Sequence, residues 1–245
     1  MEFIKKSIEK LENELPKIIK KIAIEYNVKQ YIENQDFIDP RINLWHQFGL
    51  ITHTKRTRKI FLEELDNFLK QWEIYKEVND FLNKKIKGIS QKDLLEISFI
   101  LHDLGKIPLF GDERDDRLHE RASRDLILNS FIKDKLKEIG LEEEHIKKIA
   151  RYVGTHGVIG DKIRVSLKER NEFNINITKE KINLFLTNLA EEYSDVKEII
   201  GIFFLCDSLG KVDPKLPGAP KKAVIQLPIN IKLAQIYLKI VFSFH

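Results

Sequence analysis

Apolar residues recur at steps of three and four along most of the chain, which is the period of an amphipathic α-helix. Within residues 3–26 they include Ile8, Leu11, Leu15, Ile18 and Ile22. The 245 residues contain only 11 glycines and 7 prolines, so turns are sparse and long helices are favoured. The sequence therefore predicts an all-α fold, a single helical bundle in which strands are confined to short pieces near residues 163–165 and at the C-terminus.

Single residues predict where several helices begin and end. We expect Pro16 to divide the first helical segment in two and Gly88 to close a helix as its C-cap. Ser90, followed three residues later by Asp93, is typical of a capping box. The helix that follows extends to about residue 107 and is apolar on nearly every side, so we expect it to be the most buried one.

The second half of the chain carries weaker signals. One helix is expected from the end of a polar loop (residues 111–117) to about residue 139, and another over 146–153 that ends at Gly154. Thr178 and Ser194 are predicted N-caps of two further helices, the second covering 199–205. Residues 211–228 contain four prolines and are predicted to be loop, whereas 229–245 are ambiguous between helix and strand.

Composition limits the classes of function. Apolar residues make up 42% of the chain and charged residues 33%, which allows a sizeable core and is too apolar for disorder. The lone Cys206 excludes a disulfide framework. A net charge of +4 permits an anionic ligand without requiring nucleic acid. The most apolar run, 225–244, is interrupted by polar residues and is not expected to span a membrane, so we expect a cytoplasmic protein.

Six polar residues share one property: each lies within an apolar helix or at a helix end, where a buried polar side chain needs a partner. They are His53, His102, Asp103, His119, His156 and Asp207. Imidazole and carboxylate ligands suit Fe, Mn, Zn, Ni or Mg. Adjacent helical residues point about 100° apart, so His102 and Asp103 can still converge on one ion. His53 and Asp207 would complete a site between helices, and His119 and His156 would flank it.

This ordered series resembles the H…HD…H…H…D pattern of the HD superfamily of metal-dependent phosphohydrolases, over residues 50–211. The HDLGK segment, a polar loop and HExxS are similar to the HD regions of transfer-RNA nucleotidyltransferases and of CRISPR-associated HD nucleases. Thr155 stands where the latter often have a second histidine, a departure that bears on whether two metals bind. The chain lacks the GYP element of cyclic-di-GMP phosphodiesterases, which argues against that branch.

The resemblance implies one HD-type domain over 1–245, with residues 1–40 and 212–245 as extensions. It implies one or two divalent ions (Mn, Fe, Ni, Mg or Zn) held by His53, His102, Asp103 and Asp207, with His119 and His156 binding a second metal or phosphate. The expected reaction is hydrolysis of a phosphomonoester or phosphodiester of a nucleotide-like small substrate by a metal-bound hydroxide. The residues expected to act in catalysis are His102, Asp103, Lys106, His119 and His156, and those expected to contact the substrate phosphate are Lys106, Arg114 and Arg117.

Several alternatives stay open at this stage. His46 could replace His53 as a ligand, whereas His145 and His245 are predicted to be surface residues. The substrate could instead be single-stranded DNA or RNA, since Lys55, Arg56, Arg58 and Lys59 surround His53 in the sequence. A third reading is a catalytically idle module that binds a nucleotide or a partner protein. The sequence leaves the oligomeric state open.

Overall fold

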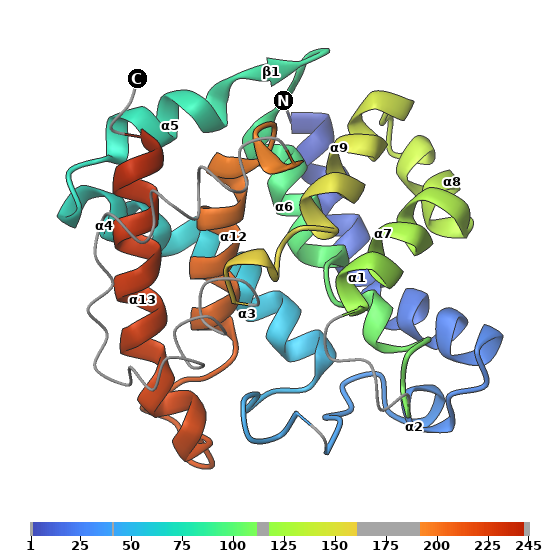
Figure 1. The fold of residues 1–245 in the computed structure, drawn as a ribbon. Coiled ribbons are helices and arrows are strands. Elements are labelled where there is room, and N and C mark those ends of the chain that lie inside the picture. Colours follow the sequence, from blue (N-terminus) through green and yellow to red (C-terminus); the bar gives the residue numbers. More distant parts are fainter. Residues whose placement is uncertain (1, 41, 112–117, 161–191, 243–245) are drawn as a thin grey trace.

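The computed structural model describes residues 2–40, 42–111, 118–160 and 192–242. Over these ranges eleven α-helices, one 3-10 helix and one two-stranded hairpin form a helical bundle (Figure 1). The predicted all-α class is confirmed. The elements are α1 (Glu2–Glu25), α2 (Lys29–Glu33), α3 (Leu50–Glu63), α4 (Leu65–Gln71), α5 (Tyr75–Asn83), β1 (Lys85–Ile86), β2 (Ile89–Ser90), α6 (Gln91–Leu101), η1 (Leu104–Lys106), α7 (His119–Asn129), α8 (Phe131–Glu138), α9 (Glu143–Val153), α12 (Lys197–Gly210) and α13 (Lys221–Phe242).

Helix α6 lies at the centre of the bundle and contacts α1, α3, α5 and α9. Every residue from Leu94 to Leu101 is buried, which confirms the prediction from its apolar sequence. The predicted cap is present too, because the Ser90 hydroxyl accepts a hydrogen bond from the Asp93 N–H at 3.1 Å. Helix α12, equally apolar, packs against α3 on one side and α13 on the other. The ends of these central helices position the polar cluster described below.

The predicted break at Pro16 is wrong, since α1 continues through it. Proline removes one hydrogen-bond donor from a helix, but Leu15 and Ile18 on either side are buried in the core, and this packing supports the helix on both sides of the proline. The same helix is tied to the centre by Arg58, which pairs with Glu12 at 2.7 Å and with Glu96 on α6 at 2.5 Å.

Gly88 does not cap a helix, because α5 already ends at Asn83. Gly88 instead lies in the tight turn of the hairpin, where β1 and β2 pair antiparallel with Ile86 opposite Ile89. The two central residues, Lys87 and Gly88, have φ values of 44° and 89°. Positive φ at both positions is the requirement of a two-residue type I′ turn, and glycine meets it without strain.

Three predictions for the later helices are corrected as well. The single helix expected up to residue 139 is two helices, because Ser130 caps the start of α8 by accepting a hydrogen bond from the Ile132 N–H. Ser194 is not an N-cap, since α12 begins after Val196. The loop predicted over 211–228 ends early, because α13 begins at Lys221 and includes Pro228, and the ambiguous residues after it are helical as far as Phe242. Thr178 and the strand piece predicted at 163–165 lie outside the described residues.

Helix α13 is long and apolar enough to cross a membrane, judged by length and composition alone. In the bundle it lies along α12 (Figure 1). The contact is close at Gly201, where an added Cβ would come within 2.6 Å of the Tyr237 and Leu238 side chains. About 39% of the apolar window of α13 is buried in the bundle. A core helix of a soluble bundle has the same length and composition, so this helix is weak evidence for a membrane span.

Candidate metal centre

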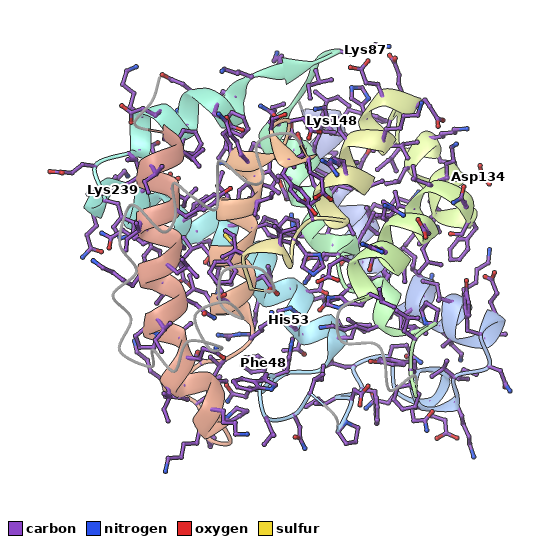
Figure 2. All side chains as sticks on the ribbon, in the orientation of Figure 1. Phe48, His53, Lys87, Asp134, Lys148 and Lys239 are labelled. Carbon is purple, nitrogen blue, oxygen red and sulfur yellow. The ribbon has the colours of Figure 1, made fainter. Side chains whose placement is uncertain are left out.

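Three helices and two turns bring the six predicted residues into one buried cluster. His53 comes from α3 and Asp207 from α12, whereas His102 and Asp103 follow the end of α6. His119 is the first residue of α7, and His156 lies in the turn after α9. Figure 2 shows His53 inside the bundle, with labelled charged side chains such as Lys87 and Lys239 at its periphery. The side chains of the cluster are at most 13% exposed.

We call His53, His102 and Asp207 the inner group. The Nε2 atoms of His53 and His102 are 3.2 Å apart. Asp207 Oδ1 lies 3.0 Å from His53 Nε2 and 3.6 Å from His102 Nε2. Asp103 Oδ2 adds a fourth ligand atom, 3.4 Å from each of the two Nε2 atoms. Two imidazoles and two carboxylates therefore present one ligand atom each to a common centre.

We call His119 and His156 the outer group. Their Nε2 atoms are 3.2 Å apart. The second oxygen of Asp103, Oδ1, lies 3.4 Å from His119 Nε2 and 3.9 Å from His156 Nε2. Asp103 thus directs one oxygen to each group. Glu120, which sequence reasoning missed, is also buried and places Oε2 3.7 Å from Nδ1 of His119.

The spacing of these atoms suits a transition-metal or magnesium ion. Ligand bonds of about 2.0–2.2 Å, at angles between octahedral and tetrahedral, separate neighbouring ligand atoms by about 2.8–3.6 Å. The inner distances of 3.0–3.6 Å match this range, and the outer group departs from it only at the 3.9 Å separation between His156 and Asp103. The donor set of the cluster could therefore hold a metal ion, which is compatible with an HD-type site.

Two of the histidine rings, His102 and His156, are held with the Nε2 lone pair directed at the cluster. Nδ1 of His102 is 2.8 Å from the Phe99 carbonyl oxygen, and Nδ1 of His156 is 2.7 Å from that of Val153. A carbonyl can only accept, so each Nδ1 carries the proton and donates it; in the neutral ring Nε2 is then unprotonated, as a metal requires. Burial, followed by the nearby His102 and His119, lowers the pKa of His156 well below 6.5. His53 Nδ1 has no hydrogen-bond partner among the described residues.

Two lysines compensate the buried carboxylates. Burial alone raises the pKa of Asp103, but the neighbouring His102 and Lys106 outweigh it and hold the pKa well below 3.8. Burial also raises the pKa of Asp207, but the charge of Lys211 outweighs it, so the pKa of Asp207 is held well below 3.8 as well. Lys106 Nζ is 2.6 Å from Asp103 Oδ2, and Lys211 Nζ is 2.5 Å from Asp207 Oδ2. The cluster therefore presents ionised carboxylates, the protonation state that binds cations.

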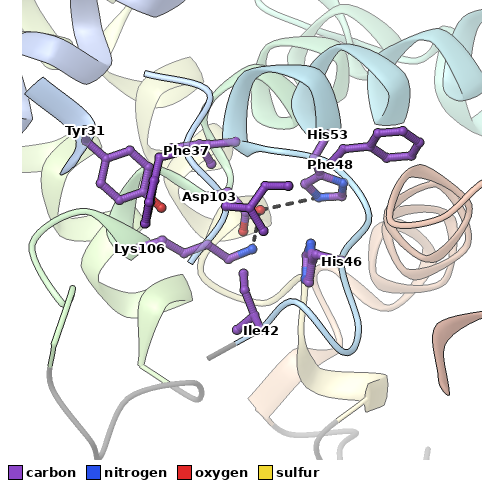
Figure 3. Close-up of a pocket in the computed structure, with 10 residues that line it drawn as sticks. Tyr31, Phe37, Ile42, His46, Phe48, His53, Asp103 and Lys106 are labelled. Carbon is purple, nitrogen blue, oxygen red and sulfur yellow. Dashed lines mark hydrogen bonds and ion pairs between the residues drawn. The ribbon is translucent and has the colours of Figure 1, made fainter. Parts of the chain in front are cut away.

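A pocket reaches the cluster on the side of His53, Asp103 and Lys106 (Figure 3). It contains about 230 Å³ of empty space, part of which is open to solvent. Apart from those three residues and His46, its lining is aromatic or aliphatic. These apolar residues are Tyr31, Phe37, Ile38, Ile42, Phe48 and Leu50.

The structure tests some of the remaining sequence predictions, whereas others fall on residues that it does not describe. His46 is not part of any group of potential metal ligands among the described residues; it lines the pocket instead. His145 is not a surface residue, because its Nδ1 accepts a hydrogen bond from the Glu142 N–H and its Nε2 lies 2.8 Å from the Ile86 carbonyl oxygen. The Thr155 hydroxyl donates to the carbonyls of Arg151 and Tyr152 on α9, and Thr155 belongs to none of the groups of potential metal ligands among the described residues. Arg114, Arg117 and His245 lie outside the described residues.

No protein-family model matches the chain, and no curated protein or solved structure is significantly similar to it. The likeness to the HD superfamily therefore depends on the ordered residues and on their convergence in the fold. That convergence supports a metal site formed by histidine and aspartate.

Proposed function

We propose that the cluster binds two divalent cations and hydrolyses a phosphate ester. The observation that supports this most directly is the placement of Asp103, whose Oδ2 faces the inner group and whose Oδ1 faces the outer group. A single ion would use only one of these sets. Of the two roles the sequence leaves open for His119 and His156, second metal or phosphate, the shared carboxylate favours the second metal.

Bound divalent cations would lower the pKa of adjacent water and neutralise charge on the phosphoryl oxygens. The protein supplies the rest of the chemistry. Ser123 fixes the turn that carries Asp103, because its hydroxyl donates to the His102 carbonyl at 2.6 Å and accepts from the Gly105 N–H at 2.7 Å. Lys106, at the pocket, provides a cation for the phosphoryl group. The apolar lining excludes water around the ester, which strengthens these charge interactions.

The pocket favours a small phosphorylated substrate over a polynucleotide. Its lining is mostly apolar, whereas a single-strand site needs an electropositive channel. Three of the four basic residues around His53 are paired with carboxylates, which makes them a poor lining for such a channel. Arg56 pairs with Asp213, Arg58 with two glutamates, and Lys59 lies 3.7 Å from Glu63. We therefore propose a nucleotide-like phosphoester as the substrate.

The test combines metal analysis with a substrate screen. Purified protein is loaded with Mn²⁺ and incubated with phosphomonoesters, cyclic nucleotides and short oligonucleotides. We expect metal-dependent release of phosphate or cleavage from a small ester, and no turnover by Asp103→Ala with an unchanged helical circular dichroism spectrum. Asp213→Ala, a carboxylate on the nearby loop, serves as the matched control.

Three outcomes would contradict the proposal. A metal-free Asp103→Ala protein that remains active would exclude a metal mechanism. A wild-type protein that binds Mn²⁺ but turns over none of the three substrate classes would favour an idle binding module, and cleavage of oligonucleotides alone would favour a nuclease.

A further inference from the structure

His46 has a buried side chain that belongs to neither group of potential metal ligands. It is 8% exposed, and its ring meets that of His53 edge to face with centroids 5.1 Å apart. Among the described residues no side chain or carbonyl makes a hydrogen bond with its ring nitrogens, although buried polar groups almost always have such a partner. Figure 3 shows the His46 ring directed into the pocket, towards the Lys106 amine and Asp103.

The segment that carries His46 is fixed in place at both ends. The Gln47 N–H donates to the Lys211 carbonyl at 2.9 Å, and the Gln47 side chain accepts from the Asp213 N–H at 2.7 Å and donates to the Pro217 carbonyl at 3.0 Å. At the other end, Asp36 accepts hydrogen bonds from the N–H and hydroxyl of Thr52. His46 is therefore held against the pocket by contacts outside it, as a binding residue needs.

The surroundings of His46 are cationic. Lys106 lines the pocket together with His46, and the charges of Lys106 and Lys211 both act on the His46 ring. An imidazole carries at least one N–H group that can donate a hydrogen bond. The only carboxylate in the lining of this pocket is that of Asp103, which faces Lys106 and the predicted ions. An anion that enters the pocket thus meets an N–H group and an ammonium from different sides.

We infer that His46 is a substrate-binding residue that, together with Lys106, holds the phosphoryl oxygens of the ester. The inference rests on the proposed function for the identity of the ligand and assigns His46 a role other than that of a metal ligand. The imidazole N–H supplies a directed hydrogen bond at a fixed position, while Lys106 supplies charge.

Phosphate binding tests this without relying on turnover. Inorganic phosphate is titrated into the Mn²⁺-loaded full chain by calorimetry. Removing one hydrogen bond to a charged ligand costs roughly a factor of ten in affinity, so His46→Phe, which keeps the ring but has no N–H, should raise the phosphate Kd about tenfold. Lys106→Met should do the same, and His46→Gln, which restores a donor, should recover part of the affinity.

Metal content separates this role from the alternatives. His46→Phe should retain the Mn²⁺ stoichiometry of the wild type, and His145→Gln, which alters a buried histidine outside the pocket, should leave the phosphate Kd unchanged. Loss of an ion in His46→Phe, or an unchanged phosphate Kd in both His46 variants, would overturn the inference. If the wild type binds metal and phosphate in this way but hydrolyses no ester, the proposed function fails while the role of His46 stands.

Discussion

The inner and outer groups share Asp103 but are built differently. The inner group takes His53 from the first turn of α3 and Asp207 from the last turn of α12, and together with Asp103 Oδ2 it combines two imidazoles with two carboxylates. The outer group takes His119 from the first turn of α7 and His156 from a turn, and Asp103 supplies the carboxylate that lies between its rings. A site with more anionic ligands on rigid helices binds a cation more tightly. The comparison teaches that the two sites should fill in order, inner before outer.

Removal of the Asp207 carboxylate is expected to have the largest effect on metal binding and activity. Asp207→Asn keeps the shape of the side chain but removes a charge and a ligand atom, so both ions should be lost or bind more than about a hundredfold more weakly. Activity should then fall by about a thousandfold or more. Metal analysis after dialysis measures the first effect. Asp213→Asn is the matched control, and an Asp207→Asn protein that keeps two tightly bound ions would refute the order of filling.

Removal of an outer ring should have a smaller, selective effect. His119→Gln should lower the metal stoichiometry from two ions per chain to one, because the inner group remains complete. We expect activity to fall by about ten- to a hundredfold, since one ion still polarises the phosphoryl group. Titration of the metal-free protein with Mn²⁺ shows the number of sites. A wild-type stoichiometry of one would remove the distinction between the groups.

Ser123 connects the helix of the outer group to the turn of the inner one. Ser123→Ala leaves the buried Gly105 N–H and His102 carbonyl without this partner, which should lower the free energy of unfolding by about 1–3 kcal/mol. Urea denaturation measures this change. Activity at a temperature where the variant is folded should fall less than about tenfold. Ser130→Ala, at the cap of α8, should cost about 1 kcal/mol without changing activity.

Acid should act on the buried imidazoles and on the buried carboxylates of the cluster in different pH ranges. In the metal-free protein the lowered pKa of His156 means that the unfolded chain takes up a proton near pH 6.5 while the folded one does not. Stability should therefore fall as the pH drops from 7.5 to 5.5, by roughly 1 kcal/mol for each such ring. The contribution of Asp207 is lost only below about pH 3.8. Urea titrations with chelator present measure this loss, and His156→Gln should reduce it; a flat profile would contradict the assigned protonation states.

Local patterns in the sequence predicted the features that depend on neighbouring residues, such as helix burial and helix ends. The apolar run and the Ser90 cap specify α6, and Gly154 follows the end of α9, as predicted. The six cluster residues were predicted because each is a polar residue in an apolar or terminal position. Lys211 could have been found by the same reasoning, since it lies one helical turn after the buried Asp207 and such pairs meet on a helix.

Contacts distant in sequence explain what was missed. His145 has charged neighbours in the sequence, which predicts a surface residue. In the fold it packs against the hairpin, where its Nε2 lies 2.8 Å from the Ile86 carbonyl oxygen. The place of His46 depends on hydrogen bonds between Gln47 and the chain after α12, which no local pattern reveals. Pro16 disfavours a continuous helix locally, but packing across the bundle outweighs that preference.

Lys106 and Lys211 have a consequence for how the protein matures. Each ammonium group already neutralises a carboxylate that an ion would otherwise have to neutralise. The newly synthesised chain can therefore reach its native state before any ion arrives, and metal acquisition becomes a late step that displaces the lysines. Chelation should then remove activity reversibly while the polypeptide stays assembled, unlike zinc-finger domains, which unfold when the metal is withdrawn.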